Sequence, residues 1–266
     1  MGRTALQNEI NSFLEKNSLN QFLTASAMSK ARTKLKADAF LAINCLLNEV
    51  YYQEKEDLKL WKGFRLLACD GSTLNLNDAS KECQRFFGIH DTTQGKGKTY
   101  ANARMSLFHD VLNDRILDAR IDAWKIAERP MLYDHLDNTV NQNDLVILDR
   151  GYTGYNVYSA ILNSNRHFLV RLRNDMLCCR DMTKSEESYT FKQKDLPDIT
   201  GRLIQIELKG GEKEYLFTSL TDQELYPYED FENLYFMRWR VEESYKALKC
   251  FLKLEDLTGT SQQTLE

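Results

Sequence analysis

Acidic residues from three distant parts of the chain stand where a metal site could form. Asp70 follows the apolar run FRLLAC and Asp149 follows DLVIL, so each carboxylate is expected at the end of a buried strand. Glu242 lies in a later segment with helical spacing, which can pack across those strand ends. Open α/β sheets place their sites where the carboxyl ends of parallel strands meet. Because clustered carboxylates need a compensating charge and hard oxygen ligands select Mg²⁺ or Mn²⁺, the pattern predicts a divalent metal site.

The segment around Glu242 carries further polar residues in one row. With a helical turn of about 100° per residue, Tyr235, Arg238, Glu242 and Lys249 share an arc of about 60° that borders an apolar stripe. Arginine can fork onto phosphate oxygens, lysine supplies a point charge, and a phenol can donate a hydrogen bond to phosphate. The simpler alternative is an ordinary amphipathic helix with an Arg238–Glu242 pair and solvated lysines.

Each aspartate also has a simpler interpretation when taken alone. Asp70 precedes Gly-Ser, which is typical of a turn or a helix cap, and Asp149 could pair with Arg150. The joint pattern is much harder to obtain by chance. Two metal ions held about 4 Å apart would clamp the attacking and leaving oxygens of a phosphodiester. We therefore expect two Mg²⁺ or Mn²⁺ ions and phosphodiester chemistry, with Arg150 and Arg173 as additional candidates for DNA contact.

The composition is that of a soluble globular protein, with 42% hydrophobic and 28% charged residues in 266. No apolar run reaches the roughly 18 residues of a membrane helix, and the start of the chain lacks a secretory signal. We expect a cytoplasmic protein with no membrane partner. The six cysteines form no CxxC pair or zinc spacing, so they are interpreted as reduced thiols without a role, including the adjacent Cys178 and Cys179.

The beginning of the chain is predicted to be helical and basic. Helical spacing covers residues 4–17, 25–36 and 37–52, with Thr24 as the expected N-cap of the second helix. Although the net charge is −4, residues 1–36 carry six Lys or Arg against two Glu. Local clusters matter more than the total for phosphate binding, so the second helix is compatible with a helix-turn-helix reader of DNA. A solvated basic helix face explains the same residues.

From Phe64 onward, strands and helices alternate in an α/β pattern. The first strand is expected to bend at Asp70, and two β-rich runs are expected to form a hairpin at Asn113-Asp114. Helices are predicted at 127–140 and 155–164, and a long helix from about residue 228. Strands are predicted in DLVILDRGY at 144–152, breaking at Gly151, and at 167–173, and a β-rich stretch is predicted at 174–227. The predicted domains are a helical, candidate DNA-binding region at 1–60, a first part of the core at 61–173, a β-rich insertion at 174–227 and the end of the core at 228–266.

Together these motifs resemble those of the DDE transposases of the insertion-sequence-4 family. The matching residues are DGST at 70–73, DRGY at 149–152, RLR at 171–173 and the spacing Y-x2-R-x3-E-x6-K, with weaker matches in SAMSKARTKL at 26–35 and ERPMLYDHL at 128–136. The resemblance implies a ribonuclease-H-like mixed sheet with flanking helices. It also implies that Asp70, Asp149 and Glu242 bind metal and that Tyr235, Arg238 and Lys249 contact DNA.

The resemblance further implies an enzyme that cleaves DNA at the ends of an insertion sequence and joins them to target DNA. Its partners would be terminal repeats, target DNA and a second copy of the chain, in the bacterial cytoplasm at the nucleoid. An extruded base would stack on an aromatic ring, for which Trp239 and Tyr152 are candidates. Because the chain ends at residue 266, shortly after Glu242, a truncated copy is considered. The alternatives are an inactive DNA-binding remnant and a metal-dependent nuclease on the same fold.

Overall fold

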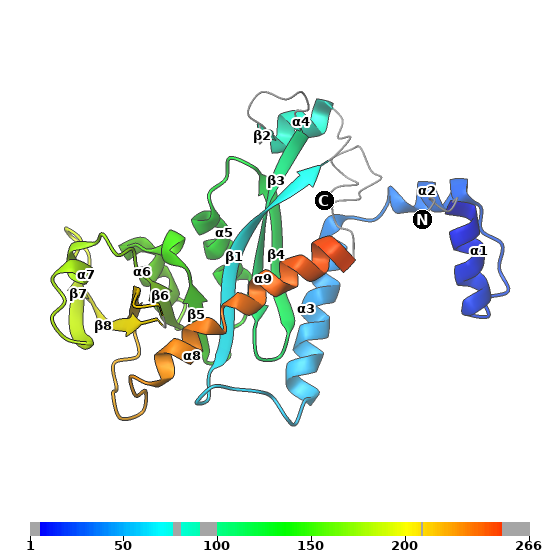
Figure 1. Ribbon diagram of the computed structural model, residues 1–266. Coiled ribbons are helices and arrows are strands. Elements are labelled where there is room, and N and C mark those ends of the chain that lie inside the picture. Colours follow the sequence, from blue (N-terminus) through cyan, green and yellow to red (C-terminus); the bar gives the residue numbers. More distant parts are fainter. Residues whose placement is uncertain (1–5, 77–80, 91–99, 209, 252–266) are drawn as a thin grey trace.

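The N-terminal part of the chain is helical in the computed structural model, which describes residues 6–76, 81–90, 100–208 and 210–251. Its helices are α1 (Leu6–Lys16), α2 (Ala25–Arg32) and α3 (Ala37–Glu54), which confirms the predicted sequence of helices. The Thr24 hydroxyl accepts a hydrogen bond from the Ala27 amide and caps α2, as predicted. Figure 1 shows α1 and α2 apart from the sheet, while α3 runs beside β4.

A nine-stranded mixed sheet forms the centre of the molecule, in the order β2-β3-β1-β5-β6-β9-β8-β7, with β4 paired to β3. Its strands are β1 (Arg65–Leu76), β2 (Ile89–His90), β3 (Tyr100–Asp110), β4 (Arg115–Ala123), β5 (Asp144–Leu148), β6 (His167–Arg171), β7 (Glu186–Phe191), β8 (Ile199–Glu207) and β9 (Lys213–Thr218). The strands β1, β5 and β6 are parallel, and the other pairings are antiparallel. This is the predicted ribonuclease-H-like mixed α/β fold.

Asp70 lies within a strand, so the predicted bend at this residue is wrong. The strand β1 continues to Leu76 because β3 pairs with it over that whole length. Its parallel partner β5 is shorter and pairs only with Arg65–Ala68. Asp70 therefore comes two residues after Ala68, the last residue of β1 that pairs with β5. That position keeps the carboxylate at the end of the parallel part of the sheet, where the sequence placed it.

The two faces of the sheet bury alternate residues of each central strand. Leu67 and Val146 face a cluster that includes residues of α5 (Glu128–Asn138) and α6 (Tyr155–Asn163). Leu66 and Leu145 face the opposite cluster, which includes residues of α8 (Asp230–Phe236) and α9 (Trp239–Lys246). This period of two is expected for a sheet covered by helices on both faces. The helices α5 and α9 thus pack on opposite faces of the sheet.

The helix expected from about residue 228 is divided into shorter pieces. After α8, the residues Met237 and Arg238 form a turn, α9 follows, and a π-helical turn, η2 (Ala247–Phe251), comes next. The Met237 amide contacts the carbonyls of both Asn233 and Leu234 at 3.3 Å, which marks a local change in hydrogen bonding. Both turn residues keep right-handed helical dihedrals, so α8 and α9 continue along nearly one line (Figure 1).

The stretch predicted as a β-rich insertion contains a short helix, α7 (Leu177–Arg180), and the strands β7 to β9. These strands extend the main sheet, since β9 pairs with β6 through Leu169 and Thr218. Within this stretch, β8 and β9 pair antiparallel, from Arg202–Thr218 to Glu207–Lys213. The domain boundaries stay a prediction, and residues 252–266 of the last predicted domain lie outside the described residues. Within the described residues, none of the helices has both the length and the apolar character that crossing a bilayer requires.

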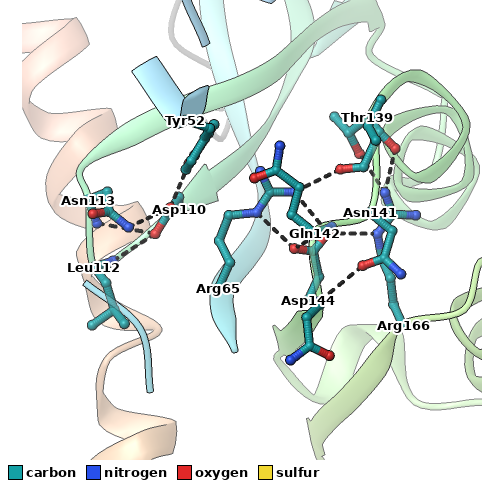
Figure 2. Close-up of polar contacts among 12 residues, drawn as sticks. Tyr52, Arg65, Asp110, Leu112, Asn113, Thr139, Asn141, Gln142, Asp144 and Arg166 are labelled. Atoms are coloured by element: carbon teal, nitrogen blue, oxygen red, sulfur yellow. Dashed lines mark hydrogen bonds and ion pairs between the residues drawn. The ribbon is translucent and has the colours of Figure 1, made fainter. Parts of the chain in front are cut away.

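A buried ion network fixes the start of β5 (Figure 2). The Asp144 carboxylate accepts hydrogen bonds from Arg65 Nε at 2.8 Å and from Arg166 Nε at 3.0 Å. All three side chains are buried, and Arg166 also donates to the carbonyls of Leu136 and Thr139. Removing one member of such a network leaves an uncompensated buried charge. The network ties β5, which leads to Asp149, to β1, which carries Asp70.

Candidate active site

Arg238 brings two of the predicted metal ligands together. Its guanidinium Nη1 lies 3.7 Å from Asp70 Oδ2, and its Nη2 donates to Glu242 Oε1 at 2.9 Å. The Arg238 side chain is only 8% exposed, whereas those of Asp70 and Glu242 are 20% and 32% exposed. The Arg238–Glu242 ion pair at i,i+4 is the one expected from an ordinary amphipathic helix. It differs from that simple case because Arg238 is buried and also contacts Asp70.

Further contacts fix α9 and η2 to β1 around this ion pair. The Tyr245 hydroxyl donates to the backbone carbonyl of Asp70 at 2.6 Å. Lys249 Nζ donates to Ser72 Oγ at 2.9 Å and to the carbonyl of Thr73. The Lys249 ammonium therefore lies along the strand that carries Asp70, two and three residues after it. Lys249, a member of the predicted row, thus lies against β1, as does Tyr245, which was not part of that row.

Asp149 follows β5 and caps the short 3₁₀ helix η1 (Arg150–Tyr152). Its Oδ1 accepts a hydrogen bond from the Gly151 amide at 2.8 Å. The Asp149 carboxylate is near enough to Asp70 to contribute to the electrostatic environment of that residue. Among the residues that the structure describes, however, no three His, Cys, Asp or Glu side chains are grouped so as to hold a metal ion. The predicted convergence of three carboxylates on one point is therefore not met in this arrangement.

The electrostatics of Asp70 favour a cation at the site. The pKa of Asp70 is raised to about 6, chiefly by burial, while Arg238 and the hydrogen bond from the Gly71 amide act in the opposite direction. The negative charges of Asp149 and Glu128 contribute to this increase. Arg238 therefore only partly offsets burial and the neighbouring carboxylates, and ionised Asp70 remains costly in this arrangement. A hard divalent cation suits these oxygen donors and would favour the ionised form of Asp70.

Glu128 is an acid at this site that the sequence analysis did not identify. It is the first residue of α5, and its Oε1 accepts a hydrogen bond from Arg104 Nη1 at 2.9 Å. Burial raises the pKa of Glu128, Arg104 opposes this, and the Asp149 charge raises it further. The available signal was its place at the start of ERPMLYDHL. Only the fold shows that this helix begins beside Asp70 and Asp149.

The remaining predicted contact residues differ in their surroundings. Tyr235 is 5% exposed, and burial raises its pKa against the effect of Arg238 and Arg171. Arg150 is exposed on η1. Arg173 is exposed in the loop after β6 and forms an ion pair with Asp175 at 3.2 Å. Of these residues, only Tyr235 is buried beside Arg238.

The two aromatic candidates for base stacking are now distinguished. Trp239 is 50% exposed, and Arg238 Cζ lies 5.6 Å from the centre of its ring. Tyr152 is fully buried, and its hydroxyl lies 3.6 Å from Cys69 Sγ inside the core. A base cannot stack on a ring that is enclosed by the protein, so the assignment of this role to Tyr152 is wrong. Trp239 stays a candidate.

Comparisons with known proteins agree with the motifs. Residues 61–266 match the family model described as "Transposase DDE domain". The chain is 23% identical over 255 residues to "Transposase InsG for insertion sequence element IS4" from Escherichia coli strain K12, which covers 91% of the chain and 57% of that relative. A solved structure, "Cryo-EM structure of piggyBac transposase synaptic complex with hairpin DNA", aligns over 70% of this chain and 40% of its own, with a TM-score of 0.46 and 10% identity.

Proposed function

The chain belongs to the transposase DDE domain family, and on that premise we propose that it is an insertion-sequence transposase of the insertion-sequence-4 type. The observation that supports the proposal is the ion-paired group of Asp70, Arg238 and Glu242 near the carboxyl ends of the parallel strands, together with the effect of the Asp149 charge on Asp70. In the proposed reaction, water attacks a phosphodiester at the element end and frees a 3′-hydroxyl. This hydroxyl then attacks a phosphodiester of target DNA, and the target strand leaves as a 3′-hydroxyl.

Asp70, Asp149 and Glu242 are the proposed ligands of two divalent ions, Mg²⁺ or Mn²⁺. Such ions, when bound, activate the attacking oxygen and stabilise the charge that develops on the leaving oxygen. Asp149 can contribute after releasing the Gly151 amide, and the Glu242 carboxylate is exposed enough to turn. Arg238 neutralises Asp70 and Glu242 in the present arrangement. Its planar fork of donors also suits a phosphate, which offers it another anionic partner.

The proposed DNA surface adjoins these acids. Tyr235, Arg238 and Lys249 supply a phenol, a guanidinium and an ammonium for phosphate contacts, and the exposed Arg150 and Arg173 lie farther out on loops after β5 and β6. The half-exposed ring of Trp239 suits an extruded base. We further propose that the helical N-terminal region contributes to DNA binding and that two copies of the chain act together on a pair of element ends.

Incubation of the purified protein with DNA that contains an element end, in Mg²⁺ or Mn²⁺, tests this function. Joined products are expected, whereas nicks alone would identify a nuclease and a gel shift without cleavage would identify a binding remnant. Asp149→Ala and Glu242→Ala should abolish cleavage but leave the fold intact. Asp198→Asn is a matched control because Asp198 is exposed and pairs with Lys192 on the insertion. Cleavage at the wild-type rate by either alanine variant would refute the assigned ligand role.

The chain spans 57% of the length of the curated relative it matches. The number of copies that act together and the DNA-binding role of the N-terminal helices can each be measured. Light scattering with and without an element end measures the number of copies in the complex. A single copy on each pair of ends would contradict the proposed dimer. A gel-shift titration of residues 61–266 against the full chain measures what the N-terminal helices add to affinity.

A further inference from the structure

The first turn of α5 contacts two segments: β1, which carries Asp70, and the loop that follows Asp149. On one side, Glu128 lies against β1 at the residue after Asp70: a Cβ atom added to Gly71 would lie only 2.5 Å from Glu128 Oε1. On the other side, Arg129 Nε donates to the carbonyl of Gly151 at 3.0 Å, and its Nη2 donates to that of Thr153 at 2.8 Å. Two adjacent residues thus connect the Asp70 strand to the loop that follows Asp149.

The side chain of Glu128 is held by more than its helix. Arg104 Nη1 donates to its carboxylate at 2.9 Å, and the Arg104 guanidinium lies 4.4 Å from the centre of the Trp124 ring. Charge-assisted hydrogen bonds of this kind fix geometry more strongly than neutral ones. The close approach also gives a reason for glycine at position 71, because any side chain there would occupy the place of the Glu128 carboxylate. The absence of a side chain at Gly71 is therefore what lets the Glu128 carboxylate lie against β1.

The same helix is fixed to the sheet farther along. His135 Nδ1 lies 2.7 Å from Asp118 Oδ2, and its Nε2 lies 2.9 Å from Ser106 Oγ. The Ser106 hydroxyl in turn donates to the backbone carbonyl of Asp70 at 3.3 Å. His135 and Ser106 are fully buried, and Asp118 nearly so. The α5 helix cannot shift relative to Asp70 without breaking these buried contacts.

We propose that Glu128 and Arg129 are positioning residues that set the distance between Asp70 and Asp149, and thereby the affinity of the site for divalent ions. The inference rests on the proposed function, because it concerns the same acids. Arg129 acts through the backbone on either side of Tyr152, which limits how far the loop after Asp149 can move. Glu128 adds a carboxylate that approaches from the face opposite Glu242. Neither residue need touch the DNA.

The test measures Mn²⁺ affinity by electron paramagnetic resonance, together with cleavage kinetics and melting temperature. Partners that orient metal ligands typically change affinity or activity by about 10- to 100-fold when removed. We expect Arg129→Ala to weaken Mn²⁺ binding about tenfold or more and to lower kcat, with KM for DNA within about twofold. Arg129→Lys, which can keep one of the two backbone contacts, should fall between the wild type and Arg129→Ala. If Arg129→Ala does not fold, Arg129→Lys is measured against the wild type in its place.

Glu128 is tested by two independent changes. Glu128→Gln keeps the size of the side chain and removes its charge, whereas Gly71→Ala keeps the charge and displaces the carboxylate with a methyl group. Both variants should weaken Mn²⁺ binding while keeping a melting temperature close to that of the wild type. The control is Arg180→Ala, an exposed arginine at the end of α7, which should leave Mn²⁺ affinity and kinetics unchanged.

The outcomes separate this inference from the proposed function. Failure of the wild-type protein to bind Mn²⁺ both with and without element-end DNA would refute the proposed function itself. If the wild type binds Mn²⁺ and the folded variants at Glu128, Arg129 and Gly71 bind it equally well, the positioning role alone is wrong. A loss of DNA affinity in the variants, with unchanged Mn²⁺ affinity and kcat, would also overturn it, since these residues would then serve the DNA surface.

Discussion

Asp70→Asn should stabilise the metal-free protein even as it removes a proposed metal ligand. Burial and the charges of Asp149 and Glu128 raise the pKa of Asp70 from 3.8 to about 6, despite the opposing effect of Arg238. The unfolded chain lacks this environment, so ionised Asp70 opposes folding. A pKa difference of about 2 corresponds to about 3 kcal/mol at a pH above both values. Asparagine resembles the neutral acid in shape and removes that cost.

The pH dependence has a definite sign because the folded pKa lies above the unfolded one. Between about pH 4 and pH 6 the native state binds the extra proton, so this group stabilises the fold at low pH and the effect is lost as pH rises through the folded pKa. The advantage of Asp70→Asn should therefore be about 3 kcal/mol at pH 7.5, about half of that at pH 5 and under about 1 kcal/mol at pH 4.

Urea unfolding in EDTA at these pH values measures the effect. The control is Asp175→Asn, because the Asp175 side chain is 61% exposed and pairs with an exposed arginine. The control should change the free energy of unfolding by less than about 0.5 kcal/mol. Equal or lower stability of Asp70→Asn at pH 7.5 would refute the reasoning, as would an advantage that grows toward acid pH. A gain in stability with loss of cleavage would identify Asp70 as a residue kept for function.

Three further variants test separate parts of the structure. Asp144→Asn leaves buried arginines without their anion and should lower the free energy of unfolding by about 3 to 5 kcal/mol in urea titrations; a loss under about 1 kcal/mol would contradict this. Lys249→Ala should weaken DNA binding and reduce the salt slope by about one phosphate contact, whereas an unchanged slope would place Lys249 outside the interface. Trp239→Ala should slow any step that needs an extruded base, seen by 2-aminopurine fluorescence, and Tyr152→Phe should not; equal rates for both would remove Trp239 from that role.

Much of the fold was predictable because the core strands have simple patterns. Apolar runs ending at Asp149, the hairpin at Asn113-Asp114 and the cap at Thr24 are local signals, and each was confirmed. The bend at Asp70 was wrong because the length of β1 is set by β3, which pairs with it from a distant part of the sequence. Pairing between distant segments decides where a strand ends, and local turn residues do not override it.

The site was predictable in its residue types but not in its geometry. The spacing of Arg238 and Glu242 indicates an ion pair on one helix turn, and the structure contains it. The sequence gives no means of seeing that Asp70 joins the same guanidinium, because that contact depends on how α9 crosses β1. Glu128 was missed for the same reason, since it approaches from the opposite face of the sheet.

Arg238 holds two of the three acids, Asp70 and Glu242, in an ion-paired arrangement. Carboxylates brought together at the rim of a core need a cation, and in this arrangement the guanidinium supplies it to Asp70 and Glu242. A divalent ion carries twice that charge and prefers the same oxygens, so the two cations compete for one pair of ligands. A DNA phosphate would give the Arg238 guanidinium another anionic partner once it releases Asp70 and Glu242. We infer that a site of this construction binds metal ions more readily when DNA is present, because the same side chain is then neutralised elsewhere.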